Sequence, residues 1–220
     1  MTMPFLWLFC LVACAHLYAC VRRFERVRHA TKPLLMPLLA AWYAAMAGAS
    51  ARLPVVLALL LGTVGDTLLL SARPAFFATG TACFALGHGC YIFHMLSSLP
   101  VWPDARTVLP CVAAYLLLVA VAAFRFWPHL PRRAAPFCVL YMAILAGMSC
   151  CALLYARSGM AFGWLVFAGS LLFLVSDAIL TRTTFCSNAG EHRLSVMLTY
   201  IAAQGLMTAG FLGGAIWKIN

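Results

Sequence analysis

The sequence predicts an all-α protein, a polytopic membrane bundle of eight transmembrane helices in a single domain over residues 1–220. Composition is the first indication, because 65% of the residues are hydrophobic and only 9% are charged, whereas a soluble domain carries roughly 25% charged residues. The second is that apolar runs recur along the whole chain, so that no stretch remains for a sizeable soluble domain. The basic residues behind the net charge of +10 lie between these apolar runs and form no stripe on a polar domain, which argues against nucleic-acid binding.

Eight apolar runs mark the expected helices, since a membrane span takes ~20 residues and at least ~17. They cover residues 4–20, 34–50, 54–71, 75–98, 107–127, 134–155, 160–181 and 194–216. Pro33, Pro54, Pro74 and Pro110 lie at or near the starts of these runs, where a missing backbone N–H is harmless. The first run is expected to be a retained helix, because positive charges follow it and none precedes it, the reverse of a signal peptide.

Positive charges are unequally divided between the two sets of connections. The odd-numbered connections hold eleven of them: Arg22, Arg23, Arg26, Arg28, Lys32, Arg73, Arg125, Arg132, Arg133, Arg182 and Arg193. The other side holds four: Arg52, Arg106, Arg157 and Lys218. Because positive loops stay in the cytoplasm, both termini are expected on the non-cytoplasmic side, either of a bacterial inner membrane or of the endoplasmic reticulum.

Two aspartates lie inside apolar runs, Asp66 in LLLGTVGDTLLL and Asp177 in SLLFLVSDAILT. Both stand in the setting V-[GS]-D-x-[LI]-L, and a carboxylate in hydrocarbon costs several kcal/mol, so the pair indicates a functional site. The expected topology places each ~7 Å below the inner end of its helix, at matched depth. Their separation of 111 residues also fits a four-plus-four parallel repeat.

Further polar side chains are expected in the inner half of the bundle, near the two aspartates. The candidate substrate-binding residues are Lys32, His88, Tyr91, Tyr141, Ser176, Tyr200 and Gln204. The tyrosines, the histidine and the glutamine also have a structural interpretation, as hydrogen-bonding partners between helices. Lys32, with Arg28 and Arg73, either enforces topology or attracts a lipid phosphate.

The ten cysteines form no C-x-x-C and no Cys/His ligand spacing, so no metal site is indicated. A buried carboxyl pair can supply one acid and one base. That chemistry suits cleavage of an acid-labile C–O bond, an intramembrane aspartyl protease or a proton-coupled transporter. The motifs T-V-G-D and V-S-D differ from the Y-D and G-x-G-D motifs of such proteases. A transporter would favour a carboxylate at mid-depth in a broken helix, but neither aspartate is expected at mid-depth or lies beside a proline.

An ordered set of motifs resembles the YhhN family of transmembrane lysoplasmalogenases. The set is T-K-P at 31–33, V-G-D-T-L-L at 64–69, G-H-G-C-Y at 87–91, Tyr141, the run at 169–180, and Y-I-A-A-Q at 200–204. The resemblance implies hydrolysis of the vinyl ether bond of lysoplasmenylethanolamine or lysoplasmenylcholine, to a fatty aldehyde and a glycerophospho-headgroup. It also implies Asp66 and Asp177 as the catalytic pair, a lysophospholipid substrate, and no metal or organic cofactor.

Overall fold

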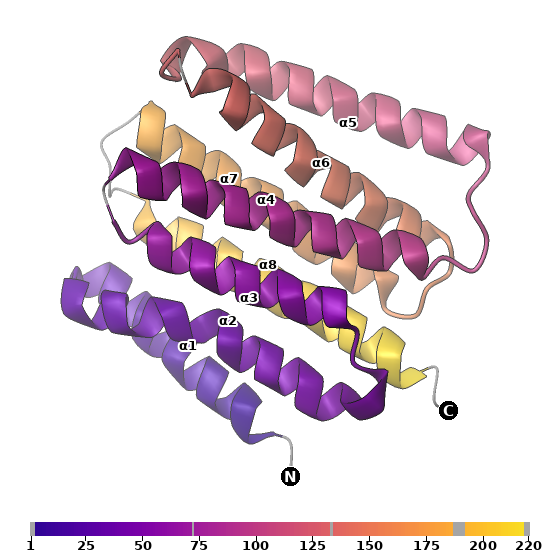
Figure 1. Cartoon of the computed structure of the whole chain (residues 1–220), viewed down its shortest axis with the longest axis horizontal. Helices are drawn as coiled ribbons and strands as arrows, with labels where there is room; N and C mark the ends of the chain where they lie inside the picture. Colours follow the sequence, from indigo (N-terminus) through magenta and orange to yellow (C-terminus); the bar gives the residue numbers. More distant parts are fainter. Residues whose placement is uncertain (1–2, 72, 133, 187–191, 218–220) are drawn as a thin grey trace.

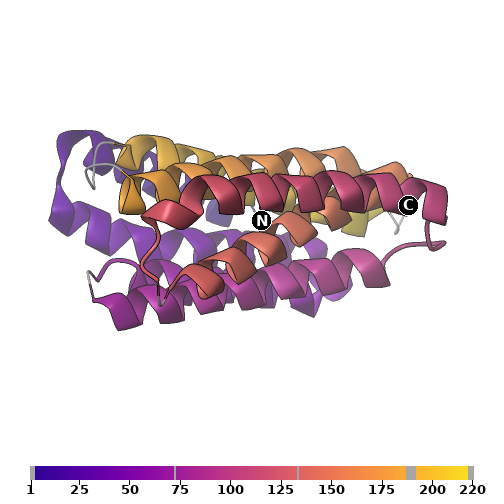
Figure 2. The same ribbon diagram turned by 90° about the horizontal axis from the view of Figure 1, so that it is seen from above.

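The computed structural model describes residues 3–71, 73–132, 134–186 and 192–217. Within these ranges the chain forms eight α-helices, two short 3-10 turns and no strand, which confirms the all-α class. The helices lie side by side along one long axis (Figures 1 and 2). Arg133 and Lys218, which enter the charge count above, and Glu191 lie outside the described residues.

Each predicted run coincides with one helix, although the ends differ by several residues. The helices are α1 Pro4–Arg22, α2 Glu25–Ala47, α3 Leu53–Leu68, α4 Pro74–Ser97, α5 Ala105–Phe126, α6 Ala135–Arg157, α7 Gly163–Phe185 and α8 Arg193–Trp217. Seven of these described helices are long and apolar enough to cross a membrane. The exception is α3, whose 16 residues extend only ~24 Å at ~1.5 Å per residue.

The start of α2 corrects the sequence prediction. The helix begins at Glu25 instead of residue 34, so Pro33 lies inside it and Lys32 lies two turns from its start. The segment before Pro33 is polar, and apolar content marks only the part of a helix that meets hydrocarbon. Its residues are still good helix formers, and the pair Glu25–Arg28 at i, i+3 supports the first turn.

The ends of α3 and α7 also differ from expectation. Asp66 is in the last turn of α3, which ends at Leu68, whereas Asp177 lies eight residues before the end of α7 at Phe185. The predicted equal distance from the helix ends is therefore wrong. After Leu68 the backbone tightens into i, i+3 hydrogen bonds, from Leu70 to Thr67 and from Ser71 to Leu68, while α7 continues through polar residues beyond its apolar run.

Six helices form a closed ring. In order, α2 packs on α3, α3 on α4, α4 on α6, α6 on α7, α7 on α8, and α8 back on α2. Outside the ring, α1 packs against α2 and α8, and α5 packs against α6 (Figure 1). Most contacts of α1 to α4 with their neighbours are thus repeated by α5 to α8, as a four-plus-four repeat predicts, although α1 also packs on α8 whereas α5 packs mainly on α6.

Glycines allow close helix contacts in both halves. A Cβ atom at Gly169 of α7 would lie 2.7 Å from the carbonyl oxygen of Ala203 on α8. A Cβ atom at Gly65 of α3 would lie 2.7 Å from the ring of Phe84 on α4. Real Cβ atoms do not approach so closely, so these helix pairs depend on glycine at the contact. This close packing at Gly65 holds the turn of α3 that also carries Asp66 against α4.

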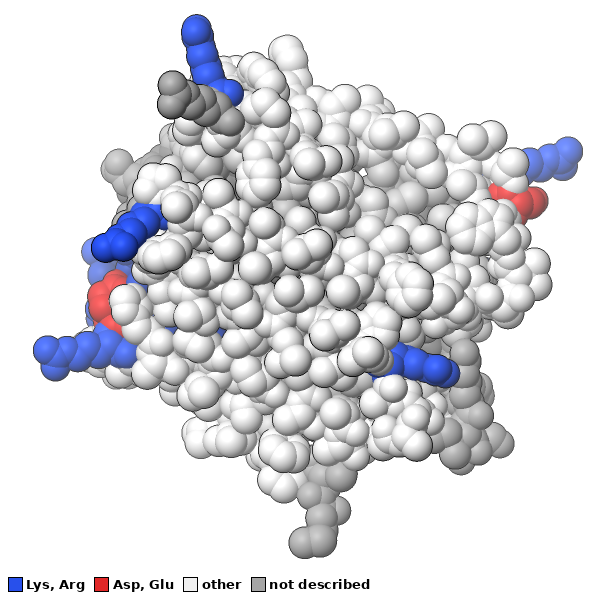
Figure 3. All heavy atoms as spheres, in the orientation of Figure 1, with Lys and Arg blue, Asp and Glu red and all other residues white. Residues whose placement is uncertain are grey.

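Basic side chains gather at one end of the bundle, which carries the α1–α2, α3–α4, α5–α6 and α7–α8 connections. Figure 3 shows several of them along the left edge, where Figure 1 places these connections. We call this the basic end. At the opposite end Asp104 caps α5, because its carboxylate accepts a hydrogen bond from the Thr107 backbone N–H at 2.9 Å. Hydrogen bonds from the side chain and backbone of Thr107 hold the pKa of the Asp104 carboxyl below its ordinary value.

Candidate active site

The nine catalytic and substrate-binding candidates that the sequence singled out all lie on helices of the ring. All six ring helices contribute, and α1 and α5 contribute none. The residues are Lys32 on α2, Asp66 on α3, His88 and Tyr91 on α4, Tyr141 on α6, Ser176 and Asp177 on α7, and Tyr200 and Gln204 on α8.

Asp66 is buried and has two polar partners. Its Oδ1 atom lies 3.2 Å from Nζ of Lys32, and its Oδ2 atom accepts a hydrogen bond from the Tyr200 hydroxyl at 2.8 Å. Only 3% of the Asp66 side chain and 11% of the Lys32 side chain are exposed. A buried charge is tolerated only when it is paired and hydrogen-bonded. Both conditions are met here, because Lys32 and Tyr200 together engage both carboxyl oxygens of Asp66.

Asp177 has a different environment. Its Oδ2 atom accepts a short hydrogen bond from the Tyr141 hydroxyl. That hydroxyl also lies 3.4 Å from Nε2 of His88, whose buried Nδ1 atom has no hydrogen-bond partner among the described residues. Over the same residues no cation forms an ion pair with Asp177. The second carboxyl group therefore belongs to a chain of polar contacts, Asp177–Tyr141–His88, that includes no cationic partner among the described residues.

An aromatic wall joins the two carboxyl environments. The ring of Phe173 stands edge-on to His88 at 4.7 Å and edge-on to Tyr200 at 5.5 Å between centroids. Phe84 packs edge-on against the same tyrosine at 6.1 Å. On this wall Phe173 contacts both Tyr200, the partner of Asp66, and His88, which contacts Tyr141, the partner of Asp177. The site thus combines two carboxyl groups with an aromatic lining.

Three of the predicted substrate-binding residues hold helices together. The Tyr91 hydroxyl donates to Oε1 of Gln204 at 2.8 Å, which ties α4 to α8. The Ser176 hydroxyl donates to the carbonyl oxygen of Val196 at 3.1 Å, which ties α7 to α8. These contacts satisfy the polar atoms locally, as interhelical hydrogen bonds do. Tyr91, Gln204 and Ser176 therefore lie beside the carboxyl groups with their hydroxyl or carbonyl groups already engaged.

Two features of the site are absent from the sequence prediction. Phe84 and Phe173 were indistinguishable from ordinary core residues, because an aromatic residue in an apolar run carries no signal of its own. The bridge of Glu25 to Arg193 on α8 was also missed, since it joins residues 168 positions apart. The spacing of Glu25 and Arg28 at i, i+3 was the one local signal that a charged cluster begins there. Among the described residues, no group of three His, Cys, Asp or Glu side chains could hold a metal ion.

The fold and the site define a polytopic helical membrane protein with two unlike carboxyl groups inside a closed ring of helices. The chain belongs to the YhhN family, whose sequence profile matches residues 27–211. This stretch begins within α2, so α1 precedes it.

Three relatives illustrate the similarity. The chain is 33% identical to human lysoplasmalogenase TMEM86B, over 74% of this chain and 65% of that protein. It is 36% identical to the pig lysoplasmalogenase TMEM86B, over 73% of this chain and 63% of the relative. It is 31% identical to a lysoplasmalogenase of Mycobacterium bovis, over 73% of this chain and 60% of that protein. The match thus spans less than two thirds of each relative. No solved structure matches the chain.

Proposed function

We propose that this protein is a lysoplasmalogenase-like hydrolase that cleaves the vinyl ether bond of a lysoplasmalogen. The products would be a fatty aldehyde and glycerophosphoethanolamine or glycerophosphocholine. Relatives named lysoplasmalogenase support the substrate class. The observation that carries the proposal is the pair of unlike carboxyl groups in the ring, Asp66 with a cation and Asp177 without one among the described residues.

The difference between the two environments supports an assignment of the two roles. Asp66, paired with Lys32, is the carboxylate that stabilises a positive intermediate and acts as base. Asp177 is the acid, because a half-buried carboxyl group with no counter-ion among the described residues is held most cheaply in its neutral form. Two carboxyl groups whose environments differ in this way are the usual arrangement for acid and base work in one site.

The reaction follows from these roles. Asp177 delivers its proton to the β-carbon of the vinyl ether, and the C=C electron pair forms the new C–H bond and leaves an oxocarbenium ion next to the ether oxygen. Water then adds to the oxocarbenium carbon, and Asp66 accepts the proton that the water loses. This two-carboxyl chemistry through an oxocarbenium-like state is familiar from glycoside hydrolysis.

Collapse of the hemiacetal restores both groups. Its hydroxyl proton returns to Asp177, the C–O bond to the glycerol breaks, and Asp66 gives its proton to the departing glycerol oxygen. The net change is one water consumed, with one aldehyde and one alcohol formed. Tyr141 and His88 would orient Asp177, and Tyr200 would orient Asp66, through the contacts described above.

The test is aldehyde release from purified protein given lysoplasmenylethanolamine. We expect Asp66→Asn and Asp177→Asn each to lower the rate by about 10²–10⁴-fold, the range for loss of a general acid or base. Asp104→Asn is the matched control, because it changes an exposed carboxylate at a helix cap where asparagine serves equally well. Full activity in both site variants would exclude this mechanism.

A second readout tests the chemistry itself. In D₂O, protonation by Asp177 would place one deuterium on the carbon next to the aldehyde, which rapid reduction to the alcohol would preserve for mass spectrometry. Aldehyde without this label would contradict protonation of the β-carbon. If no aldehyde forms at all, cleavage of a helical peptide or pH-driven flux in liposomes would instead favour a protease or a transporter.

We also propose that the basic end faces the cytoplasm, with both termini on the other side. The uneven distribution of basic residues supports this orientation. In sealed vesicles of known sidedness, and in a variant whose ten native cysteines are replaced by serine, a thiol reagent that cannot cross the membrane should label His129→Cys only from the cytoplasmic side. Cys at position 101, in the α4–α5 connection, should be labelled only from the opposite side. The reverse pattern would overturn the orientation.

A further inference from the structure

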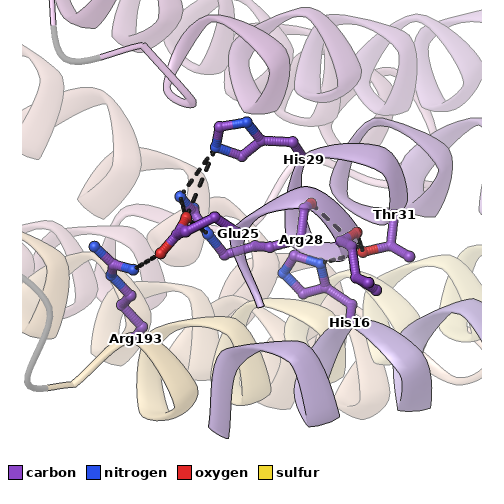
Figure 4. A network of polar contacts seen from close by, with 7 residues as sticks. His16, Glu25, Arg28, His29, Thr31 and Arg193 are labelled. Carbon is purple, nitrogen blue, oxygen red and sulfur yellow. Dashed lines mark hydrogen bonds and ion pairs between the residues drawn. The ribbon is translucent and has the colours of Figure 1, made fainter. Parts of the chain in front are cut away.

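Glu25 occupies a cationic cluster at the basic end, next to the site. Its Oε2 atom accepts hydrogen bonds from Nε and Nη2 of Arg28, at 2.9 and 2.5 Å. Its Oε1 atom accepts from Nη1 of Arg193 on α8 (Figure 4). Both carboxylate oxygens are thus held by guanidinium groups from two ring helices. Planar guanidinium groups bind carboxylate and phosphate in the same forked geometry.

The cluster leads inward to Asp66 along α2. Glu25, Arg28 and Lys32 follow one face of the helix at i, i+3 and i+7. The exposed fraction of the side chain falls from 47% at Glu25 to 19% at Arg28, 11% at Lys32 and 3% at Asp66. The stripe therefore connects the surface of the bundle to the buried carboxylate without crossing another element.

A second contact fixes this part of α2. The Thr31 hydroxyl lies 2.8 Å from Nδ1 of His16 on α1 and donates to the carbonyl oxygen of Val27 at 2.7 Å (Figure 4). His16 is fully buried at this contact. The first turns of α2 are thereby held between α1 and α8, so that Arg28 has a defined position relative to Lys32.

We propose that Arg28 and Arg193 bind the headgroup phosphate of the lysophospholipid, and that Glu25 occupies this phosphate site in the free protein. This inference rests on the proposed function and deepens it. On binding, the phosphate oxygens replace the Glu25 carboxylate on the two guanidinium groups, and the half-exposed Glu25 side chain turns to solvent. It also reassigns Lys32, whose ammonium group is taken by Asp66 and serves the carboxylate instead of the phosphate.

The spacing of the substrate supports this assignment. Arg28 and Lys32 are four residues apart, which is ~6 Å along a helix. Five single bonds of about 1.5 Å, staggered, separate the vinyl ether oxygen from the phosphorus and span roughly 6 Å. A phosphate held by Arg28 and Arg193 therefore brings the ether oxygen level with the Lys32–Asp66 pair.

Binding of an uncleavable analogue, 1-O-alkyl-lysophosphatidylethanolamine, to the full chain in maltoside micelles tests the proposal. We expect Arg28→Gln and Arg193→Gln each to weaken binding roughly tenfold, the effect of one charge-assisted hydrogen bond. Arg26→Gln is the matched control, because Arg26 is exposed at the same end outside the cluster. Glu25→Gln should tighten binding, since it removes the competing charge, and 1-O-alkylglycerol without phosphate should bind all variants equally.

Three results would overturn the assignment: weaker binding in Glu25→Gln, equal losses in Arg26→Gln and Arg28→Gln, or the same losses for alkylglycerol. The opposite sign expected for Glu25→Gln separates the effect from misfolding. Loss of the arginine dependence in phosphatidylcholine nanodiscs would assign the site to bulk lipid and contradict the substrate assignment. Because the analogue is not cleaved, this pattern can hold even if aldehyde release is never observed, which separates the two proposals.

Discussion

Asp66 and Asp177 lie on α3 and α7, the third helices of the two halves, but they have different partners. Lys32 on α2 precedes Asp66 by 34 residues, and Tyr141 on α6 precedes Asp177 by 36. His88 on α4 follows Asp66 by 22 residues, and Tyr200 on α8 follows Asp177 by 23. Corresponding helices of the two halves thus contribute a cation from α2 and a phenol from α6, and an imidazole from α4 and a phenol from α8.

The difference between the halves teaches how a repeated scaffold can hold two chemical roles. Identical surroundings would leave two equal carboxyl groups competing for one proton. Lys32 breaks this equality by pairing with Asp66 alone. Asp177 is left with the hydroxyl of Tyr141. The substitutions below are designed to remove this asymmetry or to measure it.

Loss of the cation should have the largest effect. In Lys32→Met, Asp66 loses its counter-ion, and breaking a buried pair costs about 3–5 kcal/mol of stability when one charge is left behind. We expect aldehyde release to fall about 10³-fold, in the middle of the range for losing an acid or base. The double variant Lys32→Met with Asp66→Asn should be more stable than Lys32→Met alone in thermal unfolding, though equally inactive. Normal activity in Lys32→Met would sink the assignment of Asp66 as a carboxylate.

The two site tyrosines should matter unequally. Tyr141→Phe removes the hydroxyl bound to Asp177 and should lower kcat about 10²-fold, at the lower end of general acid–base effects. Tyr200→Phe should cost only about tenfold, because Asp66 keeps Lys32 and loses one charge-assisted hydrogen bond. Steady-state rates with saturating substrate measure both. Equal losses would mean that the halves are equivalent.

His88 is expected to act through Tyr141 as a positioning residue. His88→Phe should lower kcat about tenfold, through loss of the contact of its Nε2 atom with the Tyr141 hydroxyl. Residues of one hydrogen-bonded chain are not additive, so His88→Phe should add little to Tyr141→Phe. Multiplying losses in the double variant would show instead that His88 acts independently of Tyr141.

Packing provides a stability comparison within the second half. Gly169→Ala places a methyl group against the backbone of Ala203 and should cost about 1–3 kcal/mol, as overpacked cores do. Gly205→Ala on α8 meets nothing within 4 Å and is the matched control, with no expected loss. Thermal unfolding in detergent compares the two. Equal midpoints would contradict the close contact of α7 and α8.

The smallest effect is expected outside the ring. The Tyr115 hydroxyl on α5 lies 2.8 Å from Oγ of Ser149 on α6. Ser149 is eight residues, about two turns, along α6 from Tyr141. Tyr115→Phe should cost about 1 kcal/mol of stability, the value of one neutral hydrogen bond, and leave aldehyde release within about twofold of wild type. A large loss of activity would mean that α5 takes part in the site.

The helices and the two aspartates were predictable because each has a local signal. Hydrophobic runs mark every membrane helix, and a carboxylate within such a run is conspicuous wherever it occurs. The helix ends were not predictable, because the polar turns at the start of α2 and the end of α7 extend beyond the hydrocarbon and leave no apolar pattern. The equal distances of Asp66 and Asp177 from their helix ends, inferred from those runs, failed for the same reason.

The partners of the aspartates depend on the ring, which no local pattern encodes. Lys32 was expected near a phosphate, since nothing in T-K-P indicates that its ammonium group meets Asp66 on the next helix. Phe173 packs against both His88 and Tyr200 and so contacts both carboxyl environments, yet in the sequence it is one more apolar residue of α7. Contacts between residues distant in sequence are set by helix packing, so only the fold reveals them.

The most direct test of the account is the protonation state of each carboxyl group in the resting protein at neutral pH. Infrared difference spectra between wild type and each variant would detect the carbonyl band of a neutral carboxylic acid. The account predicts that this band is present in wild type, persists in Asp66→Asn and disappears in Asp177→Asn. A band that persists in Asp177→Asn and disappears in Asp66→Asn would contradict the assignment of acid and base.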